Sequence, residues 1–328
     1  MKLTTQECTA LARQVIDGNS LDTSVLNTIA NAPEESVFSI MAGADLIRQA
    51  FYKRQINLCT ICNGKSGKCT EDCSFCSQSK FADSDIDIYP LLTQEKLCEG
   101  GNNVMDSPVN RYAIVTSGKR LDRQEVAQVA AAISTLKNKR LSYCVSLGIL
   151  DNQDFRILKN AGVSRYHHNL ETARSHFTNI CTTHTYDDRV HTIKAARKAG
   201  MSICAGGLFG AGESMEQVLE LALDLKNLDV DAVPVNFLTP IAGTRFENYN
   251  DLTPLKCLKI ISLIRFVLPA KDILVCGGRE YNLKMLHPMI FHAGASGMMT
   301  GSYLTISGIQ METDLKMLHQ IGFRPRRH

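Results

Sequence analysis

Tryptophan is absent from this chain of 328 residues, and aromatic residues account for only 6% of it. No apolar run approaches the length that crosses a bilayer, so we expect no membrane-spanning segment. An excess of one charge is also lacking, because the formal net charge is only +3. The basic end, Arg324–His328, has no reinforcement elsewhere, and we interpret it as a solvated tail. The sequence therefore favours neither a membrane partner nor a nucleic-acid partner.

Internal repeats, low-complexity segments and an export signal are missing as well. A chain of this size with 44% hydrophobic residues can bury a large core without disulfide staples. Its 12 cysteines, in the absence of an export signal, predict a reducing cytoplasm, where thiols serve as ligands or core residues. We therefore expect a cytoplasmic protein.

Short apolar runs alternate with amphipathic segments through most of the chain. Eight strands alternating with helices, without a linker, predict an α/β fold of the (β/α)8 TIM-type, with a doubly wound open sheet as the alternative. We divide the chain into an N-terminal helical extension (1–52), the barrel (53–310) and a C-terminal helix with the basic tail (311–328). The expected strands are 54–62, 111–117, 140–148, 163–170, 201–209, 232–239, 272–277 and 297–301. The expected helices between them include 122–138, 151–161, 186–199, 213–228 and 253–268, and Thr4 or Thr5 caps an earlier one.

Cys69, Cys73 and Cys76 form a C-x3-C-x2-C triplet in the run from Gly67 to Gln78. Three thiolates on one short loop can hold three irons of a cubane [4Fe–4S] cluster and leave the fourth iron open. A closed structural site would need a fourth protein ligand nearby, whereas an open iron invites a substrate to chelate it. The triplet therefore predicts a catalytic iron–sulfur cluster.

Other interpretations of the triplet stay open. Zinc sites are built from paired C-x2-C arms, and Cys59-x2-Cys62 followed by Cys73-x2-Cys76 would supply two arms. Against zinc, Cys59 and Cys62 lie in a segment that alternates like a buried strand. Unliganded thiols and a disulfide framework are the remaining alternatives.

Four more cysteines fall inside the predicted strands one, three, five and seven. A closed barrel stacks its interior in layers of four side chains from alternate strands, so we expect these cysteines to converge. A converging set of buried thiolates implies a metal centre, although each cysteine alone would pass for a small core residue. Cys62 lies an odd number of positions from Cys59 and should point outward, and Cys181 is expected to be inert. The four converging residues are Cys59, Cys144, Cys204 and Cys276.

Polar residues follow several predicted strands. Tyr166–Glu171 ends the fourth strand at the carboxyl end, where barrel enzymes build their sites, and its two histidines suit hydrogen bonding better than metal binding. The glycine-rich run Gly206–Glu213 follows the fifth strand and lets a ligand approach the backbone. Asn236 needs a partner such as a ligand's amide or urea group. Arg189 either clamps a carboxylate or pairs with a neighbouring aspartate.

The triplet resembles that of radical S-adenosylmethionine (SAM) enzymes, and the surrounding sequence resembles the biotin synthase family in particular. The resemblance runs from about residue 20 nearly to the C-terminus. The matching runs are 67–78, 143–148, 166–172, 182–186 with Arg189, 204–213, 234–237, 278–280 and 294–301.

The resemblance implies a sulfurtransferase that converts dethiobiotin to biotin in the last step of biotin synthesis. A [4Fe–4S] cluster on the triplet would bind SAM and cleave it to a 5′-deoxyadenosyl radical, and an auxiliary iron–sulfur cluster would donate the sulfur. A flavodoxin- or ferredoxin-type electron donor and a homodimer are also implied. By position, the SAM contacts would be Phe75, Asn169, Glu171, Arg189, Gly206, Gly207 and Leu208, and the dethiobiotin contacts would be Asn169, Asn236, Thr305 and Ser307.

The chain departs from the family at the auxiliary cluster, which the usual member holds as a two-iron cluster with three cysteines and one arginine. Two of those ligands are missing, because Ala113 and Leu274 stand where the third cysteine and the arginine should be. Cysteines gained on strands one and seven offer replacements. We therefore expect a relocated all-cysteine cluster, four-iron in preference to two-iron. Its expected ligands are Cys59, Cys144, Cys204 and Cys276.

Two other functions remain open. Another radical SAM enzyme on the same barrel, such as a maturase of hydrogenase type, would keep the triplet and change the substrate. An iron–sulfur carrier or a zinc-binding interaction protein would have no enzymatic activity.

Overall fold

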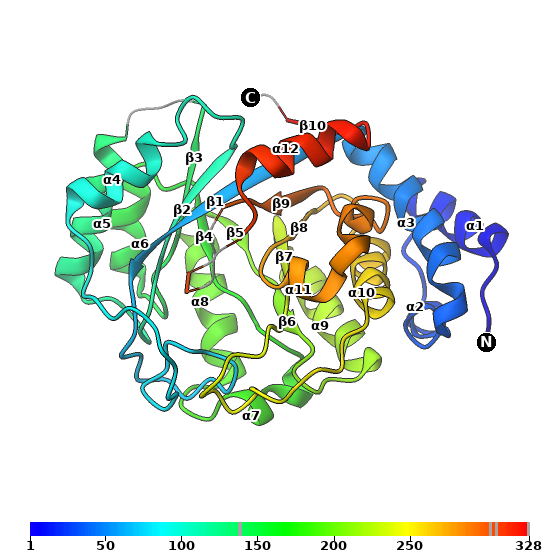
Figure 1. The fold of residues 1–328 in the computed structure, drawn as a ribbon, viewed down its shortest axis with the longest axis horizontal. Helices are drawn as coiled ribbons and strands as arrows, with labels where there is room; N and C mark the ends of the chain where they lie inside the picture. The colour runs from blue at the N-terminus through cyan, green and yellow to red at the C-terminus, as the bar shows by residue number, and fades with distance from the viewer. Residues whose placement is uncertain (137–139, 302–303, 306–307, 327–328) are drawn as a thin grey trace.

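Parallel strands form a closed ring at the centre of the molecule, and helices cover its outer face (Figure 1). The computed structural model describes residues 1–136, 140–301, 304–305 and 308–326. The strands are β1 (Gln55–Lys65), β2 (Arg111–Thr116), β3 (Ser142–Ser146), β4 (Arg165–His167), β5 (Ser202–Cys204), β6 (Gly207–Phe209), β7 (Ala232–Phe237), β8 (Asp272–Val275), β9 (Gly297–Met299) and β10 (Arg324–Pro325).

The strand order closes the ring. Neighbours follow the order β1-β2-β3-β4-β5-β7-β8-β9, and β9 pairs with β1. Because β5 and β6 both pair with β7, they are two pieces of one barrel strand, and the barrel has eight strands. The predicted (β/α)8 barrel is confirmed, and the open sheet is ruled out. β4 is shorter than the expected 163–170, and the chain then turns at Glu171, where φ is 70°.

The helices between strands begin at caps that the sequence carries. The Asp122 side chain accepts a hydrogen bond from the Glu125 N–H at the start of α5, and Ser214 accepts one from Gln217 at the start of α9. The five expected helices between strands are confirmed, with ends that differ by a few residues. The helices are α1 (Thr5–Ile16), α2 (Thr23–Ala30), α3 (Val37–Tyr52), α4 (Gln94–Asn102), α5 (Arg123–Thr135), α6 (Asn152–Asn160), α7 (Phe177–Ile180), α8 (Tyr186–Lys198), α9 (Met215–Asn227), α10 (Pro254–Val267), α11 (Arg279–Leu283) and α12 (Met311–Gln320).

Helices α1, α2 and α3 gather on one side of the barrel (Figure 1). Thr4 caps α1 as expected, and its side chain and that of Glu7 exchange hydrogen bonds with each other's backbone. α3 packs against both α1 and α10. A Cβ at Gly43 would lie 2.6 Å from the Cys8 carbonyl oxygen, so α3 and α1 approach closely because position 43 has no side chain. α2 carries no side-chain cap and gives a weaker sequence signal.

The C-terminal end returns to the barrel. β10 pairs in parallel with β1, where Gln55 lies opposite Arg324. The Arg326 N–H donates to the Ile56 carbonyl at 2.9 Å. Main-chain hydrogen bonds therefore hold residues 324–326 beside the start of β1, while the side chains of Arg324 and Arg326 are exposed, as a solvated basic end predicts. Residues 327–328 lie outside the described part. Across the described ranges, we find no helix with both the length and the apolarity to span a bilayer.

The long polar connection 77–93 is fixed against the barrel rim. Its Tyr89 exchanges two main-chain hydrogen bonds of 3.1 Å with Ser66, and its Asp83 N–H donates to the Gly243 carbonyl at 2.9 Å. Gly243 has a φ of 79°, and a Cβ there would lie 1.9 Å from the Asp83 carbonyl oxygen. Only glycine therefore fits at position 243, where the chain meets the connection 77–93.

We expect Gly243→Ala to destabilise the fold more than Gly162→Ala. Both glycines have positive φ, 79° and 97°, where an alanine costs about 1–2 kcal/mol. At position 162 nothing lies within 4 Å of the added Cβ, whereas at 243 it meets main-chain atoms of Asp83. Thermal unfolding of the two variants measures the difference. Equal melting temperatures would contradict the close approach of the two segments.

Candidate active site

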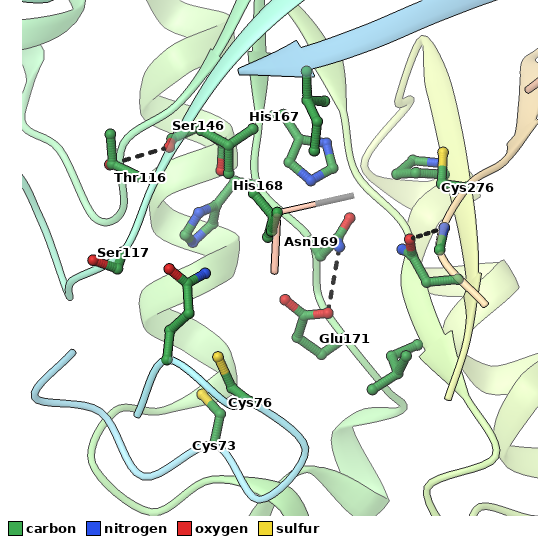
Figure 2. A pocket seen from close by; sticks show the side chains of 18 of the residues that line it. Cys73, Cys76, Thr116, Ser117, Ser146, His167, His168, Asn169, Glu171 and Cys276 are labelled. Atoms are coloured by element: carbon green, nitrogen blue, oxygen red, sulfur yellow. Dashed lines mark hydrogen bonds between the residues drawn. The ribbon is translucent and has the colours of Figure 1, made fainter. Parts of the chain in front are cut away.

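A cavity of about 430 Å³ lies inside the barrel and carries sulfur at two ends. Figure 2 shows Cys73 and Cys76 on one side of it, Cys276 on the other, and Asn169 and Glu171 between them. The cysteines that line the cavity are Cys59, Cys69, Cys73, Cys76, Cys144, Cys204 and Cys276. The two sets of cysteines singled out in the sequence therefore face one common space.

The triplet loop follows β1 and is folded by its own main chain. The Cys76 N–H donates to the Cys73 carbonyl at 3.0 Å, and the Cys69 N–H donates to the Gln78 carbonyl at 3.0 Å. These bonds turn the loop so that all three thiols reach the cavity. Burial raises the pKa of Cys76 to about 11 and also raises that of Cys69. These thiols therefore stay protonated at neutral pH unless a cation draws off the proton.

The segment after α7 fastens this loop to the barrel. The Asp72 carboxylate accepts hydrogen bonds from the Thr182 N–H at 2.9 Å, the Thr182 hydroxyl at 2.6 Å and the Thr183 N–H at 3.2 Å. Burial opposes ionisation of Asp72, but these bonds outweigh burial and hold its pKa below the ordinary value. Its neighbour Glu71 pairs with the His184 ring. Neither carboxylate gave a sequence signal of its own, because its partners lie more than a hundred residues away.

Arg189 connects this network to the segment after β4. Its Nε donates to His184 Nε2 at 3.0 Å, and its Nη1 donates to the Asn169 carbonyl at 2.8 Å and lies 3.3 Å from Glu171 Oε1. The Asn169 amide donates to Glu171 Oε2 at 3.3 Å. Burial raises the pKa of Glu171, and the Arg189 charge opposes that rise. Arg189 therefore pairs with Glu171. The ion pair with Asp187 or Asp188, one of the two alternatives left open by the sequence, does not form in the described part of the chain.

Cys181 lies beside the triplet. Its Sγ and that of Cys73, together with a ring nitrogen of His184, fall within 4.8 Å of one another. The Cys181 thiol also donates to Asp72 Oδ1 at 3.3 Å. Contact with Cys181 raises the pKa of Cys73, and the same contact lowers that of Cys181 to about 4. Cys181 was expected to be inert, but the turn after α7 brings it to the triplet loop, where it contacts Cys73.

The glycine-rich run after β5 packs tightly against the segment after β4. A Cβ at Gly206 would lie 2.0 Å from the Pro234 carbonyl oxygen, and one at Gly207 would lie 2.7 Å from the Glu171 carbonyl oxygen. The Leu208 N–H donates to that same Glu171 carbonyl at 2.7 Å. Two glycines are therefore required for β5, β6 and β7 to close together around this segment, and Leu208 lines the cavity.

Two polar groups in the middle of the cavity suit a ligand. The Asn236 amide donates to the Gly207 carbonyl at 3.2 Å and its oxygen accepts from the Gly277 N–H at 3.0 Å, which leaves one donor and one lone pair unused by these bonds. His168 is buried, lines the cavity, and its Nε2 has no hydrogen-bond partner among the described residues. A buried polar atom without a partner is uncommon, and a bound ligand would satisfy it.

Two further expected contacts, Phe75 and Thr305, line the cavity. Phe75 lines the cavity next to the triplet. Thr305 also lines it, and its hydroxyl lies 3.1 Å from that of Ser77 in the triplet loop. Ser307 lies outside the described residues.

The four strand cysteines line the deep end of the cavity. They come from β1, β3 and β5 and from the position just after β8, the seventh strand of the barrel. Contact between Cys59 and Cys276 lowers the pKa of Cys59 and raises that of Cys276. His167 Nδ1 lies 3.4 Å from Cys204 Sγ. Cys62, by contrast, packs in the outer hydrophobic layer and does not line the cavity.

The departures from the family pattern also face this end. Ala113 and Leu274 line the cavity, so the two positions without a ligand side chain are in the wall where ligands are expected. Burial raises the pKa of Cys144 to about 11. Thiols and apolar groups thus share this end of the cavity with the polar side chains of Arg111, Arg165 and His167.

Two models of known protein families match successive parts of the chain. Residues 65–225 match the Radical SAM superfamily, and residues 234–324 match the Biotin and Thiamin Synthesis associated domain. The biotin synthase of Desulfatibacillum aliphaticivorans is 54% identical over 97% of each chain. The chain belongs to the biotin synthase family. A second family member, from Geotalea uraniireducens (strain Rf4), is 43% identical over 95% of this chain and 96% of its own.

Solved structures resemble the barrel at much lower identity. Methylornithine synthase (PylB) is similar with a TM-score of 0.83 at 21% identity, covering 97% of both chains. The FeFe-hydrogenase maturase HydG from Carboxydothermus hydrogenoformans gives a TM-score of 0.81 at 19% identity, covering 98% of this chain and 80% of its own. At such identities the likeness establishes the fold alone, and membership of the biotin synthase family rests on the sequence relatives.

We expect Asp72→Asn to loosen the triplet loop and lower the free energy of unfolding. A hydrogen bond to a charged group contributes about 1.5–3 kcal/mol, and Asp72 accepts several. Because the folded-state pKa of Asp72 is lowered, this stability is present above the unfolded-state pKa of about 3.9 and is lost as pH falls through the folded-state pKa. Urea unfolding at pH 7 and near pH 3, below the unfolded-state pKa, measures it.

Asp85→Asn, at an exposed position in the connection that follows the loop, is the matched control and should leave stability unchanged. Equal stability of Asp72→Asn and the unsubstituted protein at pH 7 would contradict the anchoring role.

Proposed function

We propose that this chain is a radical SAM sulfurtransferase that inserts sulfur into dethiobiotin to form biotin. The observation that carries the proposal is one cavity with the cysteine triplet at one end, four more thiols at the other, and hydrogen-bonding groups between them. A radical made at the first end needs a substrate within reach and shielded from water, and sulfur insertion needs a sulfur source next to that substrate. The high identity to biotin synthases supports the same reaction.

The residues at the triplet end fit a [4Fe–4S] cluster with SAM. Cys69, Cys73 and Cys76 would hold the cluster, which supplies the electron that cleaves SAM when it is bound. Arg189 would hold the SAM carboxylate, since its Nη2 carries two further donors beyond the bonds described above. Glu171 would accept hydrogen bonds from the ribose hydroxyls.

The remaining SAM contacts would be made by main chain and apolar groups. Gly206 and Gly207 lie in the chain between Cys204 and Leu208, which line the cavity, and their bare backbone would let adenine lie close. Leu208 and Phe75 line the same space and would bury the adenosine. Asn169 lies between the two ends and would bridge SAM and the second substrate (Figure 2).

The deep end fits an auxiliary iron–sulfur cluster held by cysteine alone. Its four thiols come from four separate strands, and no carboxylate competes for a metal among the described residues that line this end. Three of these thiols are buried and Cys59 is half-buried, and iron would displace their protons on binding. We propose a four-iron cluster in preference to a two-iron one, with its sulfide as the sulfur donor.

The substrate would lie between the clusters. Asn236 and Asn169 would bind the ureido ring of dethiobiotin, because each amide offers both a donor and an acceptor. Thr305 and Ser307 would receive the carboxylate. A flavodoxin- or ferredoxin-type electron donor and a homodimer complete the proposal and rest on the family resemblance.

Incubation of the anaerobically reconstituted protein with dethiobiotin, SAM and a reductant should yield biotin and 5′-deoxyadenosine. Biotin and deoxyadenosine are quantified by chromatography with mass detection. Deoxyadenosine without biotin would instead indicate another radical SAM reaction, and a brown protein that does not cleave SAM would indicate a carrier. A colourless protein containing zinc would overturn both clusters.

Iron and sulfide analysis tests the auxiliary ligands. Two four-iron clusters give about eight irons per chain. Cys59→Ser and Cys276→Ser should each lose about half of that iron and keep SAM binding, because the triplet is untouched. Cys62→Ser is the matched control on the same strand and should keep all of it, since Cys62 does not line the cavity. An unchanged iron count in the first two variants would remove the proposed ligand set.

A further inference from the structure

Two arginines share the deep end of the cavity with the four thiols. Arg111 begins β2 and lies directly opposite Cys59 of β1, and Arg165 begins β4 and lies directly opposite Cys144 of β3. Paired residues of parallel strands point to the same face of the sheet, so each arginine projects to the same side as its neighbouring cysteine. Both arginines line the cavity.

These two guanidiniums have no acidic partner among the described residues. Arg165 is only 8% exposed, and its Nε donates to the Ser202 hydroxyl at 3.0 Å. Neither arginine forms an ion pair within the described part of the chain. The acidic side chains that line the cavity are Glu71 and Glu171, and both are engaged at the triplet end, with His184 and Arg189.

Arg165 is buried and Arg111 is half-buried, and two charges of the same sign in one chamber are costly without an anion. An arginine does not escape this cost by losing its proton, because its ordinary pKa lies far above neutrality. A chamber with buried cations and no carboxylate therefore calls for an anion that is absent from the polypeptide itself.

We propose that Arg111 and Arg165 are the counter-charges of the auxiliary iron–sulfur centre and raise its reduction potential. This inference rests on the proposed function, in which four thiolates bind that centre. An all-thiolate centre is an anion, and each thiolate added in place of a neutral or cationic ligand lowers its potential. The two guanidiniums offset that charge and can donate hydrogen bonds to its sulfur atoms.

The chain lacks the arginine ligand of the family pattern but keeps positive charge in this chamber. Where the family resemblance places an arginine on the seventh strand, this chain has Leu274, and Cys276 faces the same cavity. At β8, therefore, the cavity wall has a thiol and no arginine. The positive charge comes instead from Arg111 of β2 and Arg165 of β4. The guanidiniums act here through space, as positioning and electrostatic groups, and not as ligands.

A redox titration of the reconstituted holoenzyme, followed by electron paramagnetic resonance, tests the inference. Arg165→Gln and Arg111→Gln should each move the midpoint of the auxiliary centre to a more negative potential, and the double variant should move it further. The midpoint of the triplet cluster is the internal control and should not change. Arg165→Lys keeps the charge, so the midpoint of the auxiliary centre should stay close to that of the unsubstituted protein.

Three results would overturn the inference. The first is an unchanged auxiliary midpoint in both glutamine variants with the iron content intact. The second is loss of the auxiliary iron in Arg165→Lys as well as in Arg165→Gln, which would indicate ligation or packing. The third is a higher KM for dethiobiotin without a potential shift, which would assign the guanidiniums to the substrate carboxylate. An unsubstituted protein with iron for only one cluster would instead refute the auxiliary cluster of the proposed function.

Discussion

Parallel pairing around a closed ring is the constraint from which the site follows. Because every strand runs in the same direction, residues at matching register face one interior, and the loops after the strands meet at one rim. Cys59 illustrates this, since β1 sets it beside Arg111 of β2 on one side and beside Met299 of β9 on the other. Closure depends on a bare backbone at Gly297, where a Cβ would lie 2.7 Å from the Asn57 carbonyl oxygen.

The two ends of the cavity differ in how charge is balanced. At the rim, the Glu71 carboxylate pairs with the His184 ring, and the Glu171 carboxylate pairs with Arg189. His184 Nε2 also accepts a hydrogen bond from Arg189. At the deep end, Arg111 and Arg165 line the cavity with four thiols and have no acidic partner among the described residues. The rim is therefore held by bonds within the protein, whereas in our proposal the deep end reaches charge balance only when an anionic centre is bound.

The sequence alone predicts the features of the fold that depend on periodic or local patterns. Eight strands, their connecting helices and the inward position of Cys59 relative to Cys62 follow from alternation, caps and strand register. It failed where the decisive partner is distant: the contact of Cys181 with Cys73 spans more than a hundred residues, and no local pattern marks it. The pairing of Arg324 with Gln55 failed for the same reason, because a short basic end and an added edge strand have the same local composition.

The two sets of thiols also differ in what assembles them. Cys69, Cys73 and Cys76 lie on one short loop, so little chain entropy is lost in bringing them together. The four deep thiols come from strands that are up to 217 residues apart in the chain, from Cys59 to Cys276, and they meet only when the barrel has closed. A cluster bound by these four thiols, as we propose, would therefore be assembled inside a folded barrel.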